Sequence, residues 1–243
     1  MWLAGSKPRD VYVGTRALAV CQGVELEAAV EVTGLDEALE ALQRWLGVVG
    51  SGQRLRIWLS GGLCRPFIVP AVEGVRTTDE LRRVALALAP ERTGLLDKCL
   101  VWVDSGGVRG TRSVAVALQE AVLDKFYLSL SEAKGRHTAM SVRPWWSEVL
   151  RHVVVRDSAI AAVSVQDCDS LTFLAGAGDS YGTVTTYSPI NDPDMARSTL
   201  ARALLSADVG AGQEVNGRLA LGGVPADRLA KRVALAPLLE LSR

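Results

Sequence analysis

The sequence has few of the residues on which acid–base and metal chemistry usually depend. Its 243 residues include only two histidines and four cysteines. The cysteines, Cys21, Cys64, Cys99 and Cys168, lie tens of residues apart, so no pair has metal-ligand or redox spacing. P-loop, dinucleotide-binding, zinc-protease and nucleophile-elbow motifs are absent as well. The sequence therefore gives no sign of the enzyme classes that these motifs identify.

Net charge and long apolar runs are also missing. Lysine plus arginine and aspartate plus glutamate number 27 each, so electrostatics gives no reason to expect nucleic acid as a partner. No uncharged apolar run approaches the roughly 20 residues that cross a bilayer, and the first eight residues are too short and polar for a secretion signal. We expect a cytoplasmic chain that does not itself insert into a membrane, or the soluble part of a longer membrane protein.

What the sequence does contain is one order of elements that occurs twice. Alternating and helical apolar periods predict three short strands, a helix and a strand in each half. In the first half these are Asp10–Val13, Ala17–Cys21, Glu25–Val32, Asp36–Leu46 and Leu55–Leu59. In the second half they are Ala159–Val165, Leu171–Leu174, Gly182–Tyr187, Pro193–Leu205 and Arg218–Leu221. The repeat predicts an α/β protein of the actin-like class, a duplicated ribonuclease-H-like βββαβα unit forming two lobes with mixed sheets flanked by helices.

We place the boundary between the lobes after residue 150, which gives a first lobe of residues 1–150 and a smaller second lobe of residues 151–243. Within the first lobe, Gln53–Ser60 and Leu63–Val69 are predicted to form an inserted hairpin (residues 53–70) that turns at Gly61 and Gly62. Near the boundary, Trp145 and Trp146 are adjacent. Such a pair is typical either of a wedge between two lobes or of a docking surface for a partner.

Two turns in the repeat correspond to the hairpins with which actin-like ATPases hold phosphates. Such a hairpin offers backbone N–H groups from a Gly/Ser/Thr turn, and a nearby aspartate holds magnesium through water. The first-half turn keeps Gly14 and Thr15 but has Tyr12 where such ATPases have an acid, and Asp10 lies one strand period earlier. The second-half turn has Asp167 and Asp169 but no glycine, and an aspartate-rich turn of this kind also simply closes a strand pair.

A glycine pair after the last strand of the second half, Gly222 and Gly223, occupies the place of the actin-like adenine turn, although such a pair is also an ordinary turn. The residues that would remain from a degenerate nucleotide site are therefore Gly14, Thr15, Asp167, Gly222 and Gly223. For an active site that binds ATP and magnesium, they would be Asp10, Thr15, Asp167, Asp169, Gly222 and Gly223.

The segment Arg56–Pro70 (RIWLSGGLCRPFIVP) carries a resemblance to a known family. It resembles a strand–turn–strand of the actin-like proteins of bacterial surface machines, in which a Leu-Ser…Arg-x-Phe/Tyr-x-x-Pro run precedes an acidic helix. Here Thr78–Leu81 supplies the start of that helix. The proteins concerned are PilM of type IV pili and the cytoplasmic domain of GspL of type II secretion.

The resemblance implies an assembly-platform protein at the inner face of the bacterial inner membrane. PilM binds ATP and the cytoplasmic tail of the membrane protein PilN, whereas GspL docks the secretion motor ATPase and has no convincing ATPase site. The sequence departs from the PilM phosphate loop, because the loop aspartate is replaced by Tyr12. The resemblance with this departure therefore implies a non-catalytic scaffold without a cofactor, which binds a PilN-like tail, a motor ATPase or both. Self-association as a homodimer is compatible with the resemblance. Candidate partner-binding residues are Arg65, Pro66, Phe67, Trp145 and Trp146.

Two alternatives stay open at the level of sequence. One is an ATP-binding actin-like protein or small kinase with a functional nucleotide cleft. The other is a two-lobed α/β protein unrelated to actin, in which the repeat is a coincidence.

Overall fold

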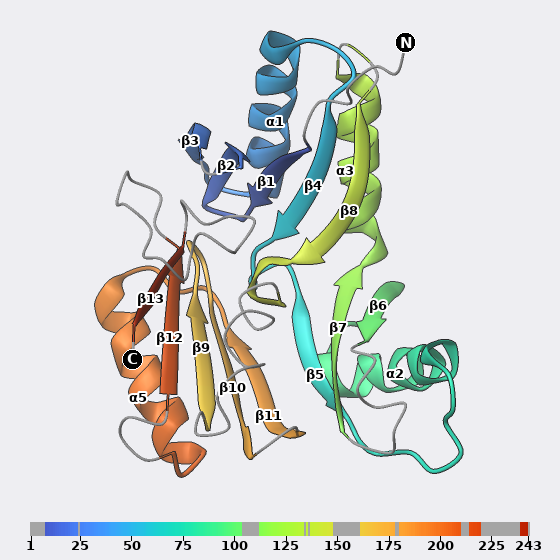
Figure 1. The fold of residues 1–243 in the computed structure, drawn as a ribbon, viewed down its shortest axis with the longest axis vertical. Helices are drawn as coiled ribbons and strands as arrows, with labels where there is room; N and C mark the ends of the chain where they lie inside the picture. The colour runs from blue at the N-terminus through green and yellow to red at the C-terminus, as the bar shows by residue number, and fades with distance from the viewer. Residues whose placement is uncertain are drawn as a thin grey trace.

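The computed structural model describes residues 8–23, 25–103, 112–133, 135, 137–147, 161–177, 180–209, 214–219 and 239–242. These residues form two five-stranded sheets and one three-stranded sheet (Figure 1). None of the helices in these ranges has both the length and the apolar character needed to cross a membrane.

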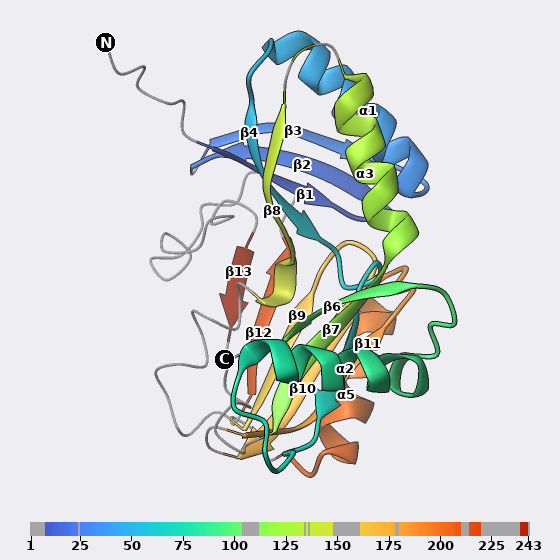
Figure 2. The same cartoon turned by 90° about the vertical axis from the view of Figure 1, so that its right-hand side faces the viewer.

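The first five-stranded sheet has the strand order β3-β2-β1-β4-β8. Its strands are β1 (Arg9–Val13), β2 (Ala17–Gln22), β3 (Glu25–Glu31), β4 (Arg54–Leu59) and β8 (Thr138–Pro144). The first three strands are antiparallel neighbours, while β4 runs parallel to β1 and β8 runs parallel to β4. Helices α1 (Leu35–Val49) and α3 (Glu120–Glu132) lie side by side on one face of this sheet (Figure 2).

The apolar period of α1 explains why it packs on the sheet. Ala38, Leu39, Leu42 and Leu46 recur at helical spacing and are buried, so they form the single apolar stripe that a surface helix turns toward the core. The same core contains the inward residues of the strands, including Ile57 of β4.

The second five-stranded sheet repeats this plan with the strand order β11-β10-β9-β12-β13. Its strands are β9 (Ala162–Gln166), β10 (Leu171–Ala177), β11 (Ser180–Tyr187), β12 (Glu214–Leu219) and β13 (Leu239–Ser242), and α5 (Pro193–Ser206) precedes β12. As in the first sheet, three antiparallel strands are followed by a helix and a parallel strand. The predicted duplication is confirmed, and the alternative of a coincidental repeat is wrong. The two copies differ in the last strand, because β13 is antiparallel to β12.

The third sheet has the strand order β5-β7-β6 and is inserted into the first half of the chain. It consists of β5 (Arg65–Val69), β6 (Cys99–Val103) and β7 (Ser113–Gln119), and α2 (Thr78–Thr93) packs against it. Thr77 and Glu80 form a reciprocal capping box at the start of α2, and Gly94 ends the helix in the left-handed conformation. We call α2 and these three strands the inserted unit.

The predicted hairpin over residues 53–70 is wrong. The two strands exist, but β4 belongs to the first sheet and β5 belongs to the inserted unit. Since β1 and β8 flank β4 on both edges, β4 has no free edge to which β5 could pair. Gly61 and Gly62 therefore lie in a connection between two sheets.

The five-stranded sheets use separate parts of the chain, residues 9–144 and residues 162–242. The predicted boundary between residues 150 and 151 lies outside the described residues. Where the sheets meet, the turn after β9 approaches the turn after β1 and the connection after β4.

Candidate functional site

The candidate site is the junction of three short segments at the ends of strands. They are the β1–β2 turn (Gly14–Arg16), the start of the β4–β5 connection (Ser60–Gly62) and the β9–β10 turn (Asp167–Ser170). Each of the two turns is closed by a backbone hydrogen bond, from Gly14 N to Ala17 O and from Asp167 N to Ser170 O, both 2.9 Å long. We call the contacts among these segments the latch.

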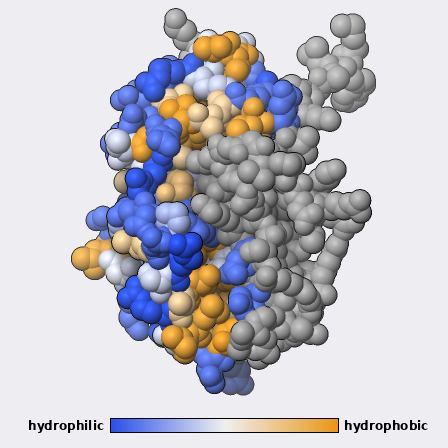
Figure 3. Space-filling view, turned by 90° about the vertical axis from the view of Figure 1, so that its left-hand side faces the viewer, coloured by the Kyte–Doolittle hydropathy of each residue, from blue (hydrophilic) through white to orange (hydrophobic). Residues whose placement is uncertain are grey.

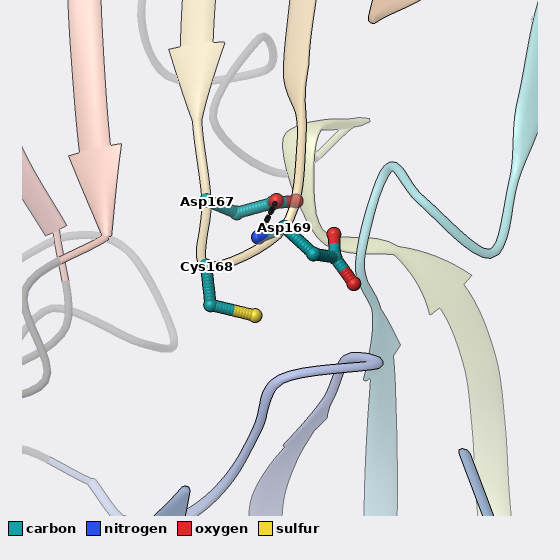
Figure 4. Close-up of side chains that lie close together, drawn as sticks. All are labelled: Asp167, Cys168 and Asp169. Carbon is teal, nitrogen blue, oxygen red and sulfur yellow. Dashed lines mark hydrogen bonds between the residues drawn. The ribbon is translucent and has the colours of Figure 1, made fainter. Parts of the chain in front are cut away.

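Asp169 forms the centre of the latch. Figure 4 shows its carboxylate pointing toward the connection between β4 and β5, while the Cys168 thiol points toward the β1–β2 turn. Asp169 Oδ2 accepts hydrogen bonds from Thr15 N at 2.7 Å, from Thr15 Oγ1 at 2.6 Å and from Ser60 Oγ at 3.0 Å. The residue is fully buried. A carboxylate of the second lobe thus binds the turn that, in an actin-like ATPase, offers its donors to a phosphate.

Asp167 makes a second contact across the latch. Its Oδ2 accepts a hydrogen bond from Gly61 N at 2.8 Å, so it also binds the first lobe. Its Oδ1 accepts bonds from Ser170 N at 2.9 Å and Ser170 Oγ at 2.7 Å, which hold the β9–β10 turn together. Asp167 therefore serves both its own turn and the neighbouring lobe.

Three glycines let the segments approach closely. A Cβ atom on Gly14 would lie 2.6 Å from Cys168 Sγ, and one on Gly61 would lie 2.7 Å from Thr172 Oγ1. A Cβ atom on Gly62 would lie 2.7 Å from Asp169 Oδ1. Such distances are well inside van der Waals contact, so a larger residue would separate the lobes. The glycine pair after β4 is explained by this approach and not by a hairpin.

Burial and like charge raise the pKa of Asp167 well above that of an ordinary aspartate. Desolvation is the largest cause and the Asp169 carboxylate is the second, while the bonds from Gly61 and Ser170 oppose them. Burial also raises the pKa of Tyr12 and of Cys168, and Tyr12 Oη lies 3.0 Å from Cys168 Sγ. Tyr12 thus fills the position of the missing acid with a neutral group that contacts the other lobe.

The carboxylates of the latch are poorly suited to hold a cation. Asp167, Cys168 and Asp169 place possible ligand atoms within 4.8 Å of one another. Three of the four carboxylate oxygens, however, already accept hydrogen bonds from protein donors. The fourth, Asp169 Oδ1, is buried without a hydrogen-bond partner and lies against Gly62. A magnesium ion would have to displace the bonds that join the lobes.

Asp10 does not contribute to the latch. Its Oδ1 accepts a hydrogen bond from Trp58 Nε1 at 2.8 Å, and its Oδ2 forms an ion pair with Arg56 at 2.5 Å. Arg56 is the register partner of Asp10 on β4. Asp10 was a candidate for an active nucleotide site, but its side chain is committed to the neighbouring strand. Gly222 and Gly223 lie outside the described residues.

Three of the five candidate partner-binding residues are core residues. Trp145 and Trp146 are 0% and 2% exposed, and Trp145 packs edge-on against Tyr12 with ring centroids 6.0 Å apart. Phe67 is buried beneath α2. Their prediction as a docking surface is wrong, because large aromatic side chains gain most from burial and these three obtain it within the chain. Arg65 and Pro66 are half-buried, and Arg65 donates to Gly62 O.

An apolar groove lies between the inserted unit and the first five-stranded sheet with its helices. It encloses about 310 Å³ and is lined by Arg82, Leu86, Cys99, Leu100, Val101, Trp102, Leu123, Tyr127 and Val142. Figure 2 views the molecule from the side on which α2, β6 and α3 lie. The other side, shown in Figure 3, carries separate apolar patches among hydrophilic residues.

Sequence reasoning missed this groove. β6 is an edge strand of the inserted unit, and its Leu100 is 37% exposed. Within a five-residue apolar strand, no sequence signal distinguishes an edge from a centre. Ser60 was missed as well, although a hydroxyl beside two glycines at a strand end was a possible signal of close backbone approach.

Several solved structures are similar to this chain. A Bacteroides thetaiotaomicron protein with an actin-like ATPase fold and unknown function aligns with a TM-score of 0.55 and 9% identity, over 88% of this chain and 82% of that one. The PilM-PilN type IV pilus biogenesis complex aligns with a TM-score of 0.53 and 11% identity, over 85% and 67%. The cytoplasmic domain of EpsL, an inner membrane component of the Vibrio cholerae type II secretion system, aligns with a TM-score of 0.47 and 15% identity, over 74% and 70%.

No family model and no curated protein matches the sequence. The structural likeness agrees with the element order, the equivalent strand orders of the two sheets and the facing turns at their junction. The chain therefore has the actin-like ATPase fold that its repeated sequence pattern predicts.

Proposed function

We propose that this chain is a non-catalytic scaffold of a bacterial pilus or type II secretion-like assembly platform, at the inner face of the inner membrane. The observation that carries the proposal is the position of the Asp169 carboxylate, which accepts the Thr15 N–H and O–H groups at the first phosphate turn. In this role the chain holds a membrane-anchored partner and presents it to a motor ATPase, and no bond is made or broken.

The latch supports the absence of nucleotide chemistry in two ways. First, the donors of the phosphate turn already have the side chain of Asp169 as their acceptor, so a phosphate would have to displace Asp169 from a buried site. Second, Gly14, Gly61 and Gly62 are in contact distance of the second lobe. Protein atoms thus fill the space that a triphosphate would need between the turns.

The groove supports a docking role. Four consecutive β6 residues line it, Cys99 to Trp102. Neighbouring residues of a strand point to opposite faces, so the groove runs along the edge of β6 and not over one of its faces. Among the described strands, β6 pairs only with β7. A free strand edge beside apolar side chains suits an extended apolar segment, which adds to the sheet through its backbone and fills the groove with alternate side chains.

The partner we propose for the groove is the extended tail of an inner-membrane platform protein. One of the structures with the same fold is a complex of PilM with PilN. Arg82 is the charged residue among those that line the groove, so a tail with an acidic residue beside its apolar segment would fit best. The motor ATPase would then bind elsewhere on the chain.

The first test is thermal melting with and without millimolar Mg-ATP. A site of micromolar affinity would stabilise the folded state by about 4 kcal/mol at this concentration and raise the melting temperature by several degrees, by about 2–4 °C for each kcal/mol. We expect no shift. A shift of that size would support the competing interpretation, an ATP-binding actin-like protein.

The second test is site-specific photo-crosslinking in native cells. A photoreactive amino acid at Tyr127, which is 52% exposed in the groove, is compared with one at Val48, which is 85% exposed on α1. We expect Tyr127 to crosslink to an inner-membrane platform protein and Val48 not to do so. Crosslinks from Tyr127 only to metabolic enzymes, or equal labelling from both positions, would contradict the proposal.

A further inference from the structure

The inserted unit is joined to the first five-stranded sheet by two chain connections, and the latch includes one of them. The connection from β4 to β5 begins with Ser60 and Gly61, whose O–H and N–H groups bind the carboxylates of Asp169 and Asp167. The other connection is the junction of β7 with α3, where Gln119 ends the strand and Glu120 begins the helix. With no loop between them, the position of β7 is set by the direction of α3.

The groove lies across this joint. The inserted unit supplies one wall, with Leu86 of α2 and the edge of β6. The first lobe supplies the other wall, with Leu123 and Tyr127 of α3 and Val142 of β8. Any rotation of the inserted unit about the joint therefore changes the separation of the two walls.

The second lobe also holds the inserted unit through its far strand. β5 lies beside β11, at the edge of the second five-stranded sheet (Figure 1). The three strands β5, β7 and β6 are hydrogen-bonded in that order, and a bonded sheet of this kind moves as one body. A displacement of β5 at the lobe junction is thus transmitted to β6 in the groove.

We propose that the latch and the groove are coupled, so that opening the latch at Asp169 loosens the groove and filling the groove alters the latch. The physical basis is one hydrogen-bonded sheet, which meets the latch connection at its β5 end and lines the groove with β6. Coupling between two sites is reciprocal because both bias the same equilibrium. The coupling does not depend on what the groove binds. Only its biological use rests on the docking role proposed above.

Cys99 provides a built-in reporter, because it lines the groove and is half-buried. Pulse labelling with N-ethylmaleimide, followed by peptide mapping, gives a rate for each cysteine. Cys21 is fully buried in the first-lobe core and reports global unfolding in the same sample. The variants are Asp169→Asn, which replaces the central carboxyl group of the latch with an amide, and Asp36→Asn, which changes an aspartate that is 76% exposed and pairs with Lys125 at the surface.

We expect the Asp169→Asn variant to label at Cys99 faster than the unaltered protein by about fivefold or more, the lower end of ordinary allosteric couplings. Cys21 should remain protected, and Asp36→Asn should leave both rates unchanged. A Cys99 rate that equals that of the unaltered protein while Cys21 is protected would overturn the proposal.

Global destabilisation would show itself as a parallel rise at Cys99 and Cys21. In that case the milder Thr15→Val variant distinguishes coupling from global destabilisation. It removes one hydroxyl donor to Asp169 and keeps the side-chain shape. A selective rise at Cys99 in this variant supports coupling, and its absence overturns it. Since no partner takes part, this result is independent of the crosslinking test of the docking role.

Discussion

Asp169 Oδ2 lies 2.7 Å from the backbone nitrogen of Thr15, a residue 154 positions away in the chain. One carboxylate oxygen thereby joins the turn of one lobe to the turn of the other. In an actin-like ATPase these turns face each other across a nucleotide, whereas here they touch. Each prediction about the latch follows from the direct contact.

Asp169→Ala should destabilise the protein by about 1–3 kcal/mol, the usual cost of leaving a buried polar group without its hydrogen-bond partner. The variant leaves the donors of the half-buried Thr15 and the buried Ser60 without their acceptor. Urea unfolding followed by circular dichroism measures the change. Asp36→Asn is the surface control and should stay within about 1 kcal/mol of the unaltered protein, because its ion pair with Lys125 is exposed. A loss below about 1 kcal/mol for Asp169→Ala would show that the latch contributes little.

Gly14→Ala and Gly61→Ala should each destabilise the protein by about 1–3 kcal/mol, the typical cost of overpacking. The new Cβ atoms would meet Cys168 Sγ at 2.6 Å and Thr172 Oγ1 at 2.7 Å, respectively. Gly47→Ala is the matched control, because Gly47 lies in α1 with open space around it. It should stabilise the protein by about 0.5–1 kcal/mol through helix propensity. The same sign at all three glycines would contradict the close approach of the lobes.

The contribution of Asp167 to the free energy of unfolding should fall as pH rises above about 4, the ordinary pKa of an aspartate, because the pKa of this residue is raised in the folded protein. The folded state binds the proton more tightly than the unfolded state. Its contribution is therefore complete at low pH and is lost as pH rises through the folded-state pKa. Asp167→Asn removes this group, so the difference in stability between the unaltered protein and the variant should shrink with rising pH. A difference that grows with pH would contradict the raised pKa.

Trp58→Phe should cost about 1–3 kcal/mol, the range for a buried polar group that loses a partner. It removes the indole N–H that donates to the buried carboxylate of Asp10 at 2.8 Å. Trp45→Phe is the control, since Trp45 stacks beneath the guanidinium of Arg9 at 5.7 Å and should lose no more than about 1 kcal/mol. Equal losses in the two variants would argue against a structural role for the Asp10–Trp58 bond.

Local periodicity predicted the elements of this fold well, because each helix or strand carries its own apolar pattern. The helix predicted at Pro193–Leu205 is α5, Pro193–Ser206, and the strand predicted at Asp10–Val13 is β1, Arg9–Val13. The duplication followed from the order of these elements. A glycine-rich turn between two strands was read as a hairpin because sequence alone does not show that β4 is already paired on both edges.

The site was predictable only in part. Thr15, Asp167 and Asp169 were recognised as residues of the two turns, since turn chemistry is local. That Asp169 accepts the donors of Thr15 depends on how two lobes close on each other, which no local pattern encodes. The burial of Trp145 and Trp146 was not predictable for the same reason. Adjacent aromatic residues can be buried either within the chain or against a partner, and the sequence does not distinguish the two.

The latch is built from two parts of one chain, so its two sides are always present at the same high effective concentration. A junction bridged by a diffusible ligand opens and closes with the supply of that ligand. Here the bridging carboxylate is part of the chain itself, so the closed arrangement would not depend on the concentration of nucleotide in the cell.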